Sequence, residues 1–294
     1  MLRSFLRRTL RTLSHRLPQL RRFHGRLGLG RWLAAGSARE RIHIDGDIAL
    51  ELDLSSAWFR GLYYTLDPNA MEETFLLRRF LQPTDTFVDV GAHIGYFTLL
   101  GAKYAGRVLA FEPSAETFQH LQRNLEINPR WRNKITCYPM GLSDQAGALP
   151  LYRSAQEPGA ASLRRPAYTD LTVETVPLDT LDHMLAGAPC AFIKIDVEGA
   201  EVEALTGARE TLHRHRPIVL AELNARAQRD FGRTCQAVVD VIAPLNYTTY
   251  AVTMEAGRLR LPPLAVETFT DQTIINALFL PAERAAALLA QLTP

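Results

Sequence analysis

Three acidic residues stand at the ends of apolar segments that have the composition of buried β-strands. Asp89 lies within TFVDV, Glu112 ends VLAFE, and Asp196 ends FIKID. In an open α/β sheet, ligands bind beyond the carboxyl ends of the strands. A carboxylate at such a position can accept hydrogen bonds from a ligand or take up a proton during a reaction. These residues therefore predict a ligand-binding edge on a parallel sheet.

A glycine-bearing turn follows the first of these strands and opens a helix. Its sequence, DVGAHIG, has the spacing G-x-x-x-G and lacks the third glycine of the G-x-G-x-x-G dinucleotide motif. We expect one glycine to let the backbone approach a ligand, and the other to let strand and helix pack closely. The free N–H groups of the helix start would then face the carboxylate of the ligand. The cofactor-binding residues predicted here are Asp89, Gly91, Ala92, His93 and Gly95; an ordinary strand–turn–helix is the alternative.

The second strand adds an acid at the distance that one βα unit requires. Glu112 follows Gly95 by seventeen residues and precedes Pro113. A carboxylate at that strand end can accept hydrogen bonds from both hydroxyls of a ribose. A dehydrogenase uses the same device, but the combination with G-x-x-x-G favours S-adenosylmethionine. We therefore add Glu112 and Pro113 to the predicted cofactor site.

A third turn, MGLSD at residues 140–144, follows the next strand. Its glycine, with the backbone amides and the polar pair Ser143 and Asp144, would lie where an adenine ring binds. Such Ser-Asp turns are also common as helix and turn caps, which is the competing interpretation.

The segment FIKIDVEGAE carries the predicted catalytic residues. Alternation places Lys194 and Asp196 on one side of a strand, with Asp196 at its carboxyl end. We predict that Asp196 is the general base and also contacts the cofactor, that Lys194 orients it, and that Glu222 is the alternative base. An ion pair with capping acids is the competing explanation, in which Glu201 favours the helix dipole. No spacing of His, Cys, Asp or Glu demands a metal, so none is expected, although Asp196, Glu198 and Glu222 could hold a divalent ion.

Taken together, DVGAHIGYFT, AFEPS, GLSD, PLDTL (residues 177–181) and IKIDVEGAE resemble the FkbM family of methyltransferases over roughly residues 62–223. One departure is His93, where members of that family usually have asparagine, so hydrogen bonding near the cofactor is expected to differ. The resemblance implies S-adenosylmethionine as methyl donor and, commonly, O-methylation of sugars, polyketides or other secondary metabolites. It leaves the acceptor open.

Two other functions remain as alternatives to a methyltransferase acting on a small molecule or glycan. One is a binding protein that keeps the fold and has lost catalysis, which the intact Asp89, Gly91, Gly95, Glu112 and Asp196 oppose. The other is an NAD-dependent oxidoreductase, which the absence of G-x-G-x-x-G opposes.

The order of elements predicts a class I methyltransferase fold, an α/β domain with a mostly parallel sheet and helices on both faces. Strands are expected at residues 86–90, 107–112, 135–139, 192–196, 218–223, 247–254, 258–261 and 273–280. Helices are expected at residues 68–80, 96–104, 115–128, 201–214 and 234–243. The polar segment 152–170 is expected to be either a lid or a plain surface loop.

The chain before this domain is expected to form two further parts. Residues 1–40 form a basic helical arm, and residues 41–82 form an extension with a β-hairpin turning at Asp45-Gly46 and the helix at 68–80, before a methyltransferase domain at 83–294. Residues 1–41 hold eleven arginines and one glutamate, whereas the remainder holds 22 basic and 30 acidic residues. The acidic body disfavours nucleic acid as a substrate.

The basic arm interleaves leucine and arginine at near-helical spacing. It could lie on anionic lipid, act as an organelle transit segment, or pack on its own domain or a second copy in a homo-oligomer. No apolar run reaches about 18 residues, and the three cysteines follow no ligand spacing. We therefore expect a cytoplasmic protein, associated with membranes at most peripherally. The four histidines His120, His183, His213 and His215 are expected on the surface.

Overall fold

The computed structural model describes residues 39–64, 71–154, 161–255 and 258–292. The chain divides into two compact units, residues 1–71 and 72–294. The second unit begins upstream of the boundary expected at residue 83, so the helix that ends at Phe80 belongs to it. The basic arm lies outside the described residues, apart from its last two positions.

The described part of the first unit is a β-hairpin followed by a helix. Strands β1 (Arg39–Ile44) and β2 (Ile48–Asp53) pair antiparallel, and α4 (Ala57–Tyr64) follows. The turn contains Asp45 at φ 50° and Gly46 at φ 86°. Asp and Gly tolerate such left-handed angles better than most residues. The predicted hairpin at Asp45-Gly46 is therefore confirmed, whereas α4 was not predicted.

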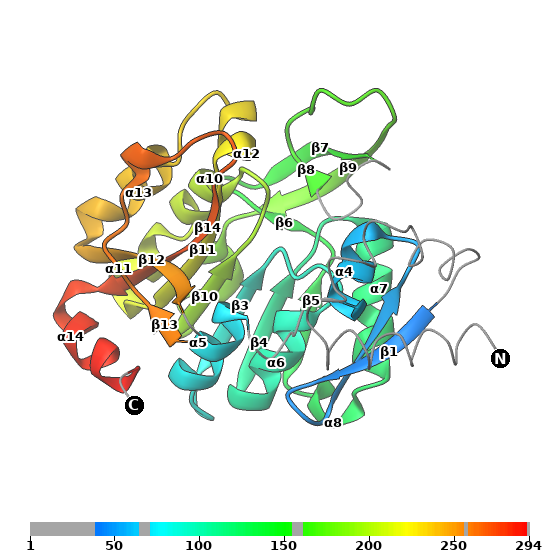
Figure 1. Ribbon diagram of the computed structural model, residues 1–294, viewed down its shortest axis with the longest axis horizontal. Helices are drawn as coiled ribbons and strands as arrows, with labels where there is room; N and C mark the ends of the chain where they lie inside the picture. The colour runs from blue at the N-terminus through cyan, green and yellow to red at the C-terminus, as the bar shows by residue number, and fades with distance from the viewer. Residues whose placement is uncertain (1–38, 65–70, 155–160, 256–257, 293–294) are drawn as a thin grey trace. The chain divides into compact units, whose positions relative to one another are not determined.

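The second unit is built on an eight-stranded sheet in the order β13-β12-β14-β11-β10-β3-β4-β5 (Figure 1). Five neighbouring strands are parallel: β5 (Ile135–Tyr138), β4 (Arg107–Phe111), β3 (Thr86–Val90), β10 (Phe192–Ile195) and β11 (Ile218–Asn224). Strand β14 (Ile274–Pro281) runs antiparallel between β11 and β12 (Tyr247–Glu255), and β13 (Arg258–Arg260) completes the edge. The predicted fold class, with its mostly parallel sheet, is confirmed.

Helices cover both faces of this sheet. On one face, a core of Val88, Val90, Ile193, Ile195 and their neighbours packs against α9 (Leu181–Leu185), α10 (Glu201–Thr206), α11 (Arg209–His215) and α13 (Gln236–Ile242). On the other face, α6 (Tyr96–Tyr104) lies so close that a Cβ on Gly101 would be 2.2 Å from the ring of Phe87. Alternate residues of each strand point to opposite faces, which makes these short strands apolar on both sides.

The remaining helices connect or flank these strands. They are α5 (Glu72–Phe80), α7 (Ala115–Glu126), α8 (Pro129–Arg132), α12 (Ala225–Asp230), α14 (Ala282–Gln291) and the short 3₁₀ turns Ala243–Leu245 and Val266–Thr268. None of the helices in the described ranges is long and apolar enough to cross a bilayer.

Two regions differ from their prediction. The helix expected at 201–214 is broken at Gly207 and Ala208 into α10 and α11. Gly207 packs against the carbonyl oxygen of Ser143, which a Cβ would approach to 1.9 Å, so this junction requires glycine. The segment 152–170, expected to be a lid or a surface loop, contains five strand residues, 152–154 and 161–162, while residues 163–170 lie in no helix or strand and residues 155–160 are outside the described ranges. The strand residues belong to a four-stranded sheet of β6 (Gly141–Leu142), β9 (Leu171–Asp179), β7 (Gly147–Ser154) and β8 (Ala161–Ser162).

One histidine also differs from its prediction. His120 is buried on the inner side of α7, at 8% exposure, so its expected surface position is wrong. His183 and His213 are exposed, as predicted.

Candidate active site

The end of β3 buries a carboxylate without fully satisfying it. Asp89 is 0% exposed, and its Oδ2 accepts a hydrogen bond of 2.6 Å from the hydroxyl of Thr98 on α6. Its Oδ1 is buried and has no hydrogen-bond partner among the described residues. Burial raises the pKa of Asp89, an effect that the charge of Lys194 and the Thr98 hydroxyl oppose. A buried oxygen without a hydrogen-bond partner suits a cationic or hydrogen-bond-donating group of a ligand.

The glycines of the following turn allow it to pack closely against neighbouring segments. A Cβ on Gly91, whose φ is 83°, would lie 1.9 Å from the carbonyl oxygen of Asp196. A Cβ on Gly95, at φ 89°, would lie 2.5 Å from Leu121 on α7. Gly91 thus packs against the backbone at the end of β10, and the expected approach of a turn glycine to a ligand stays a prediction. Gly95 is the N-cap of α6 and offers no side chain, so no side chain caps the first turn of that helix.

Backbone bonds fix the rest of this turn. The N–H groups of Gly91 and Ala92 donate to the carbonyl of Phe111 at 3.0 and 2.9 Å. His93 adopts φ 51°, a left-handed conformation in which Asn and His are both enriched, so His can stand where the resemblance to the FkbM family leads us to expect asparagine. Burial lowers the pKa of His93 to about 4, so its imidazole is neutral at physiological pH.

Glu112 joins two loops of the predicted cofactor site. Its Oε2 accepts from the N–H of His93, and its Oε1 accepts from the N–H of Ser114, each at 2.9 Å. Burial raises the pKa of Glu112 to about 7, against the effect of these two bonds. Each carboxylate oxygen keeps a second lone pair. Glu112 can therefore hold the loops and still accept hydrogen bonds from a ligand.

The third predicted turn adjoins this region. A Cβ on Gly141 would lie 3.8 Å from Cβ of Pro113, which brings the strand before Ser143 next to the Glu112-Pro113 corner. Ser143 is 4% exposed and donates from Oγ to Asp144 Oδ1 at 3.1 Å, whereas Asp144 is exposed.

A buried lysine lies at the centre of the acidic edge. Lys194 is 3% exposed, its Nζ lies 3.0 Å from Asp196 Oδ2, and it sits 4.5 Å from the ring centroid of Phe97. Burial alone would lower the pKa of Lys194. The carboxylates of Asp196, Asp89 and Glu73 outweigh it and raise that pKa, so the lysine stays cationic. The predicted Lys194–Asp196 neighbourhood is present in the fold.

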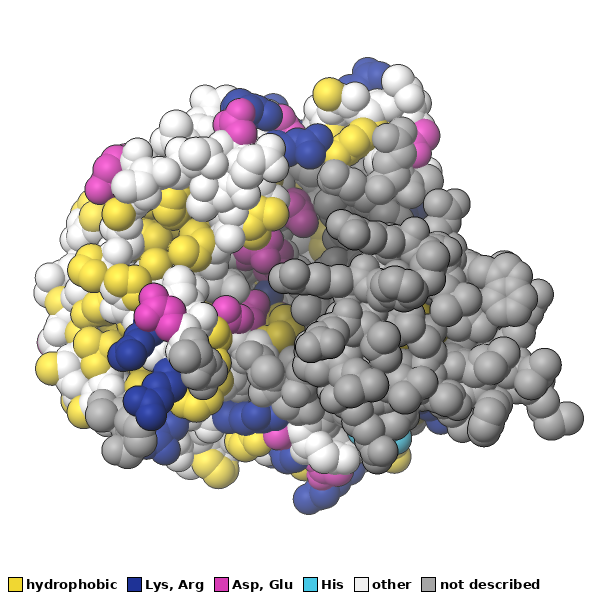
Figure 2. Space-filling view, viewed as in Figure 1, with side chains coloured by type: hydrophobic (Ala, Val, Ile, Leu, Met, Phe, Trp, Pro, Cys, Tyr) yellow, Lys and Arg dark blue, Asp and Glu magenta, His cyan; other side chains and the backbone are white. Residues whose placement is uncertain are grey.

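Asp196 also belongs to a group of three carboxylates at the ends of β10 and β11. One oxygen of each of Asp196, Glu198 and Glu222 lies within 4.8 Å of the others. Asn224 donates to Glu198 Oε2 at 3.3 Å. Burial, together with the charges of Asp196 and Glu198, raises the pKa of Glu222 to about 8. Acidic side chains gather near the middle of the face drawn in Figure 2.

Two residues of this edge escaped prediction. Glu73 on α5 is 7% exposed and accepts 2.8 Å from Nδ2 of Asn276, which pairs with Glu222 across β11 and β14. The two partners are 203 positions apart. No local spacing signals such a pair; a charged residue inside the apolar side of a predicted helix is the only hint.

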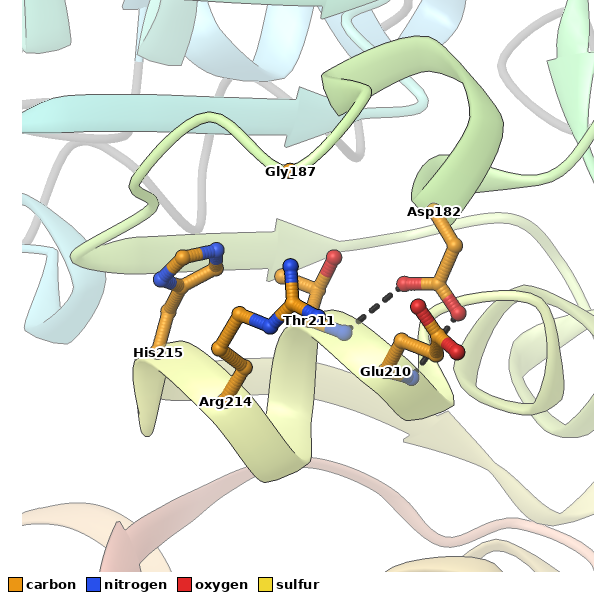
Figure 3. A pocket seen from close by; sticks show the side chains of 6 residues that line it. All are labelled: Asp182, Gly187, Glu210, Thr211, Arg214 and His215. Carbon is orange, nitrogen blue, oxygen red and sulfur yellow. Dashed lines mark hydrogen bonds between the residues drawn. The ribbon is translucent and has the colours of Figure 1, made fainter.

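A small hollow lies away from this edge (Figure 3). Asp182 accepts 2.8 Å hydrogen bonds from the N–H groups of Glu210 and Thr211 at the start of α11. The hollow is lined by Asp182, Gly187, Glu210, Thr211, Arg214 and His215. They include the segments just before β10 and β11, at the amino ends of the strands. The volume of about 10 Å³ leaves room for no more than a water molecule.

The residues present fit the nucleoside and amino-acid parts of S-adenosylmethionine. Asp89 supplies an unsatisfied buried acceptor, and Glu112 supplies spare acceptor capacity at the next strand end. No third glycine makes a pyrophosphate cradle, and the turn N–H groups of Gly91 and Ala92 are already bonded to Phe111. Backbone amides that would bind a pyrophosphate are thus engaged within the protein, which disfavours a dinucleotide.

Comparison with known proteins agrees with this geometry. The sequence profile described as the Methyltransferase FkbM domain matches residues 89–250. Methyltransferase sdnD of Sordaria araneosa is 32% identical over 162 residues, covering 44% of this chain and 62% of the relative. Hexuronic acid methyltransferase AglP of Haloferax volcanii is 31% identical over 141 residues, covering 47% and 55%. The chain thus spans about three fifths of the length of these relatives.

Solved structures resemble the chain more distantly. Methyltransferase FkbM from Methylobacillus flagellatus KT has 20% identity and a TM-score of 0.45, covering 75% of this chain and 54% of that one. SMU.1697c of Streptococcus mutans, solved in complex with SAH, has 11% identity and a TM-score of 0.43, covering 71% and 94%. The domain profile, by contrast, matches more than half of the 294 residues. The chain belongs to the FkbM family of S-adenosylmethionine-dependent methyltransferases.

Proposed function

We propose that this protein transfers a methyl group from S-adenosylmethionine to a hydroxyl of a sugar, a glycan or a secondary metabolite. The observation that carries the proposal is the contact between Gly91 and the backbone of Asp196, which is too close for a Cβ atom. It joins the predicted cofactor turn to the carboxylate end of β10. Groups suited to a methyl donor therefore adjoin groups that can accept a proton.

The residues of the chain divide the work in this proposal. S-adenosylmethionine, when bound, supplies a methyl group already activated on a sulfonium centre. Asp89 would hold the amino group of the cofactor and Glu112 its ribose, with Ser143 and Asp144 near the adenine ring. Positioning of this kind accounts for much of the acceleration in two-substrate reactions, with effective molarities of about 10⁵–10⁸ M.

An alcohol must also lose its proton as the new bond forms. Asp196 is the proposed base, with its orientation held by Lys194 at 3.0 Å. The same contact has a competing effect, because the ammonium occupies the oxygen that a substrate hydroxyl would use. Glu222, whose pKa is raised to about 8, is the alternative base and is well matched to proton transfer near neutral pH.

Two observations support a hydroxyl-bearing acceptor: the cluster of carboxylates at the ends of β10 and β11, and the substrate of one relative. Carboxylates accept hydrogen bonds from hydroxyl groups, and Asp196, Glu198 and Glu222 lie within 4.8 Å of one another. The printed name of AglP gives a hexuronic acid as the substrate of that relative. A sugar hydroxyl is therefore the first acceptor to test.

Two measurements test the proposal. Calorimetric titration with S-adenosylhomocysteine and with NAD separates a methyltransferase from an oxidoreductase; binding of NAD alone contradicts the proposal. Transfer of labelled methyl is then followed to hexuronic acids, neutral sugars and hydroxylated secondary metabolites. Tight binding of S-adenosylhomocysteine with no transfer to any of these would favour a binding protein that keeps the fold without catalysis.

A further inference from the structure

The turn after β10 has an unfavourable backbone conformation. Glu198 has φ 50° and Gly199 has φ 105°, so two consecutive residues are left-handed. The closing bond, from the N–H of Ala200 to the carbonyl of Val197, is long at 3.4 Å. A non-glycine residue in this conformation costs about 1–2 kcal/mol and persists only where its surroundings enforce it. The turn therefore needs support from outside itself.

That support converges on the peptide groups of Gly199. Its N–H donates 3.1 Å to Oε1 of Glu201, which is 1% exposed. Its carbonyl accepts two bonds, 3.1 Å from Nε2 of Gln228 and 2.7 Å from Nη2 of Arg233. Gln228 is 0% exposed and also donates to Glu201. Three side chains thus hold the two peptide groups on either side of the Gly199 Cα.

Arg233 joins this arrangement to two separate helices. Its Nη1 and Nη2 donate to both carboxylate oxygens of Glu203 on α10, at 2.8 and 2.6 Å. Its Nε donates 2.8 Å to Oε1 of Gln228 on α12. A guanidinium provides these donors in a rigid plane, and no other side chain can replace all of them. The arginine is therefore fixed on two sides before it reaches Gly199.

We propose that Arg233 is a positioning residue of the acceptor site: it holds the turn at residues 197–200 so that the carboxylate of Glu198 stays beside those of Asp196 and Glu222. The residue touches none of the three carboxylates and acts through the carbonyl of Gly199. The role of Arg233 in catalysis rests on the proposed function. The effect of Arg233 on the position of the Glu198 carboxylate can be tested without an acceptor.

The readout is the titration of Glu222. The charged groups that act on Glu222 are Asp196, Glu198, Lys194 and Glu73. Of these, only Glu198 lies in the turn that Arg233 holds. If the turn relaxes and Glu198 moves away, repulsion on the Glu222 carboxylate falls and its pKa falls with it.

The experiment compares Arg233→Gln, Arg233→Lys and Glu198→Gln with the unaltered chain. The pKa of Glu222 is followed by ¹³C NMR of carboxyl-labelled glutamate, assigned with Glu222→Gln. Glu198→Gln removes the charge directly and is expected to lower the pKa by about one unit. Arg233→Gln is expected to lower it by at least about half as much, and Arg233→Lys by less. Arg229→Gln is the matched control, since Arg229 lies on α12, four residues before Arg233, and pairs with Asp271 instead.

Binding of S-adenosylhomocysteine is measured alongside, because Arg233 has no described contact with Asp89 or Glu112. Its dissociation constant is expected to stay within about twofold in Arg233→Gln.

A Glu222 pKa that falls in Glu198→Gln and stays unchanged in both Arg233 variants overturns the inference. An equal fall in Arg229→Gln overturns it too, since the effect would then be general loosening of α12. Should Arg233→Gln fail to fold, Arg233→Lys decides. Failure of methyl transfer with a normal Glu222 response would contradict the proposed function alone.

Discussion

Glu112 carries two tasks with one carboxylate. It bonds the N–H groups of His93 and Ser114, and it stands where a ribose is expected. Its pKa of about 7 means that near neutrality the protein alternates between a carboxylate, which accepts hydrogen bonds only, and a carboxylic acid. Only the carboxylate can accept from both ribose hydroxyls while keeping its two backbone bonds.

The affinity for S-adenosylhomocysteine is therefore expected to rise with pH between 6 and 8. Below the pKa of Glu112 each pH unit lowers the ionised fraction, and with it the affinity, by up to about tenfold. Calorimetry at three pH values measures this. In Glu112→Gln the affinity should be weaker and flat across the same range; an unchanged slope in that variant would assign the titration to another group.

The base is tested by removing one carboxylate at a time. Asp196→Asn is expected to lower turnover by about 10²–10⁴-fold, measured at saturating S-adenosylmethionine because Asp196 is also predicted to contact the cofactor. If Glu222 is the base instead, Glu222→Gln has the larger effect, and the rate of the unaltered protein rises with pH up to about 8. Single-turnover rates across pH 6–9 separate the two. Full turnover in Asp196→Asn would rule out its proposed role.

At this scale, residues at strand ends were predictable and their distant partners were not. Asp89, Glu112 and Asp196 follow from strand pattern and spacing alone. Glu73 and Asn276 do not, because a side-chain contact between positions 203 apart leaves no local signature. Glu201 was interpreted through the helix dipole, whereas its buried carboxylate bonds Gly199 and Gln228 across the turn.

At the scale of elements, close contacts between loops decide where helices stop. Strands β3, β4, β10 and β11 were predicted to within one residue, since short apolar runs between helices have few other solutions. The break between α10 and α11 was missed. No sequence pattern near Gly207 predicts its contact with the carbonyl oxygen of Ser143, which leaves no room for a Cβ.

Gly207→Ala is accordingly expected to lower the free energy of unfolding by about 2 kcal/mol or more. Gly207 has φ −73°, which alanine tolerates, so the penalty comes from the 1.9 Å clash with a backbone atom. Gly147→Ala is the control, because no atom lies within 4 Å of a Cβ at that position. Urea unfolding of both variants makes the comparison, and equal stabilities would show that the α10–α11 junction adapts.

At the scale of the whole molecule, buried acids set the dependence of stability on pH. Glu112 and Glu201 have pKa values raised to about 7, and Glu222 to about 8, from 4.5 in an unfolded chain. Because the folded state binds these protons more tightly, their contribution is greatest below pH 4.5 and is lost as pH rises through 7 to 8. His93, with its pKa lowered to about 4, acts oppositely below pH 6.5.

The free energy of unfolding is thus expected to fall by on the order of 2 kcal/mol between pH 6.5 and 8.5. Glu283, whose pKa is lowered to about 2 by hydrogen bonds from Arg216, is ionised throughout this range and does not contribute to the change. Guanidinium unfolding at the two pH values measures the fall. Glu222→Gln should reduce it, and a stability that rises with pH would contradict the account.

The position of β14 has a consequence for how the site comes into being. This strand, residues 274–281, lies between β11 and β12 and brings Asn276 to both Glu222 and Glu73. The edge of β11 can therefore be covered by β14 only after the ribosome has synthesised the chain through residue 281. Until then the nascent chain carries an unpaired apolar strand next to the proposed acceptor site, and such a strand edge can bind chaperones or pair with the wrong strand.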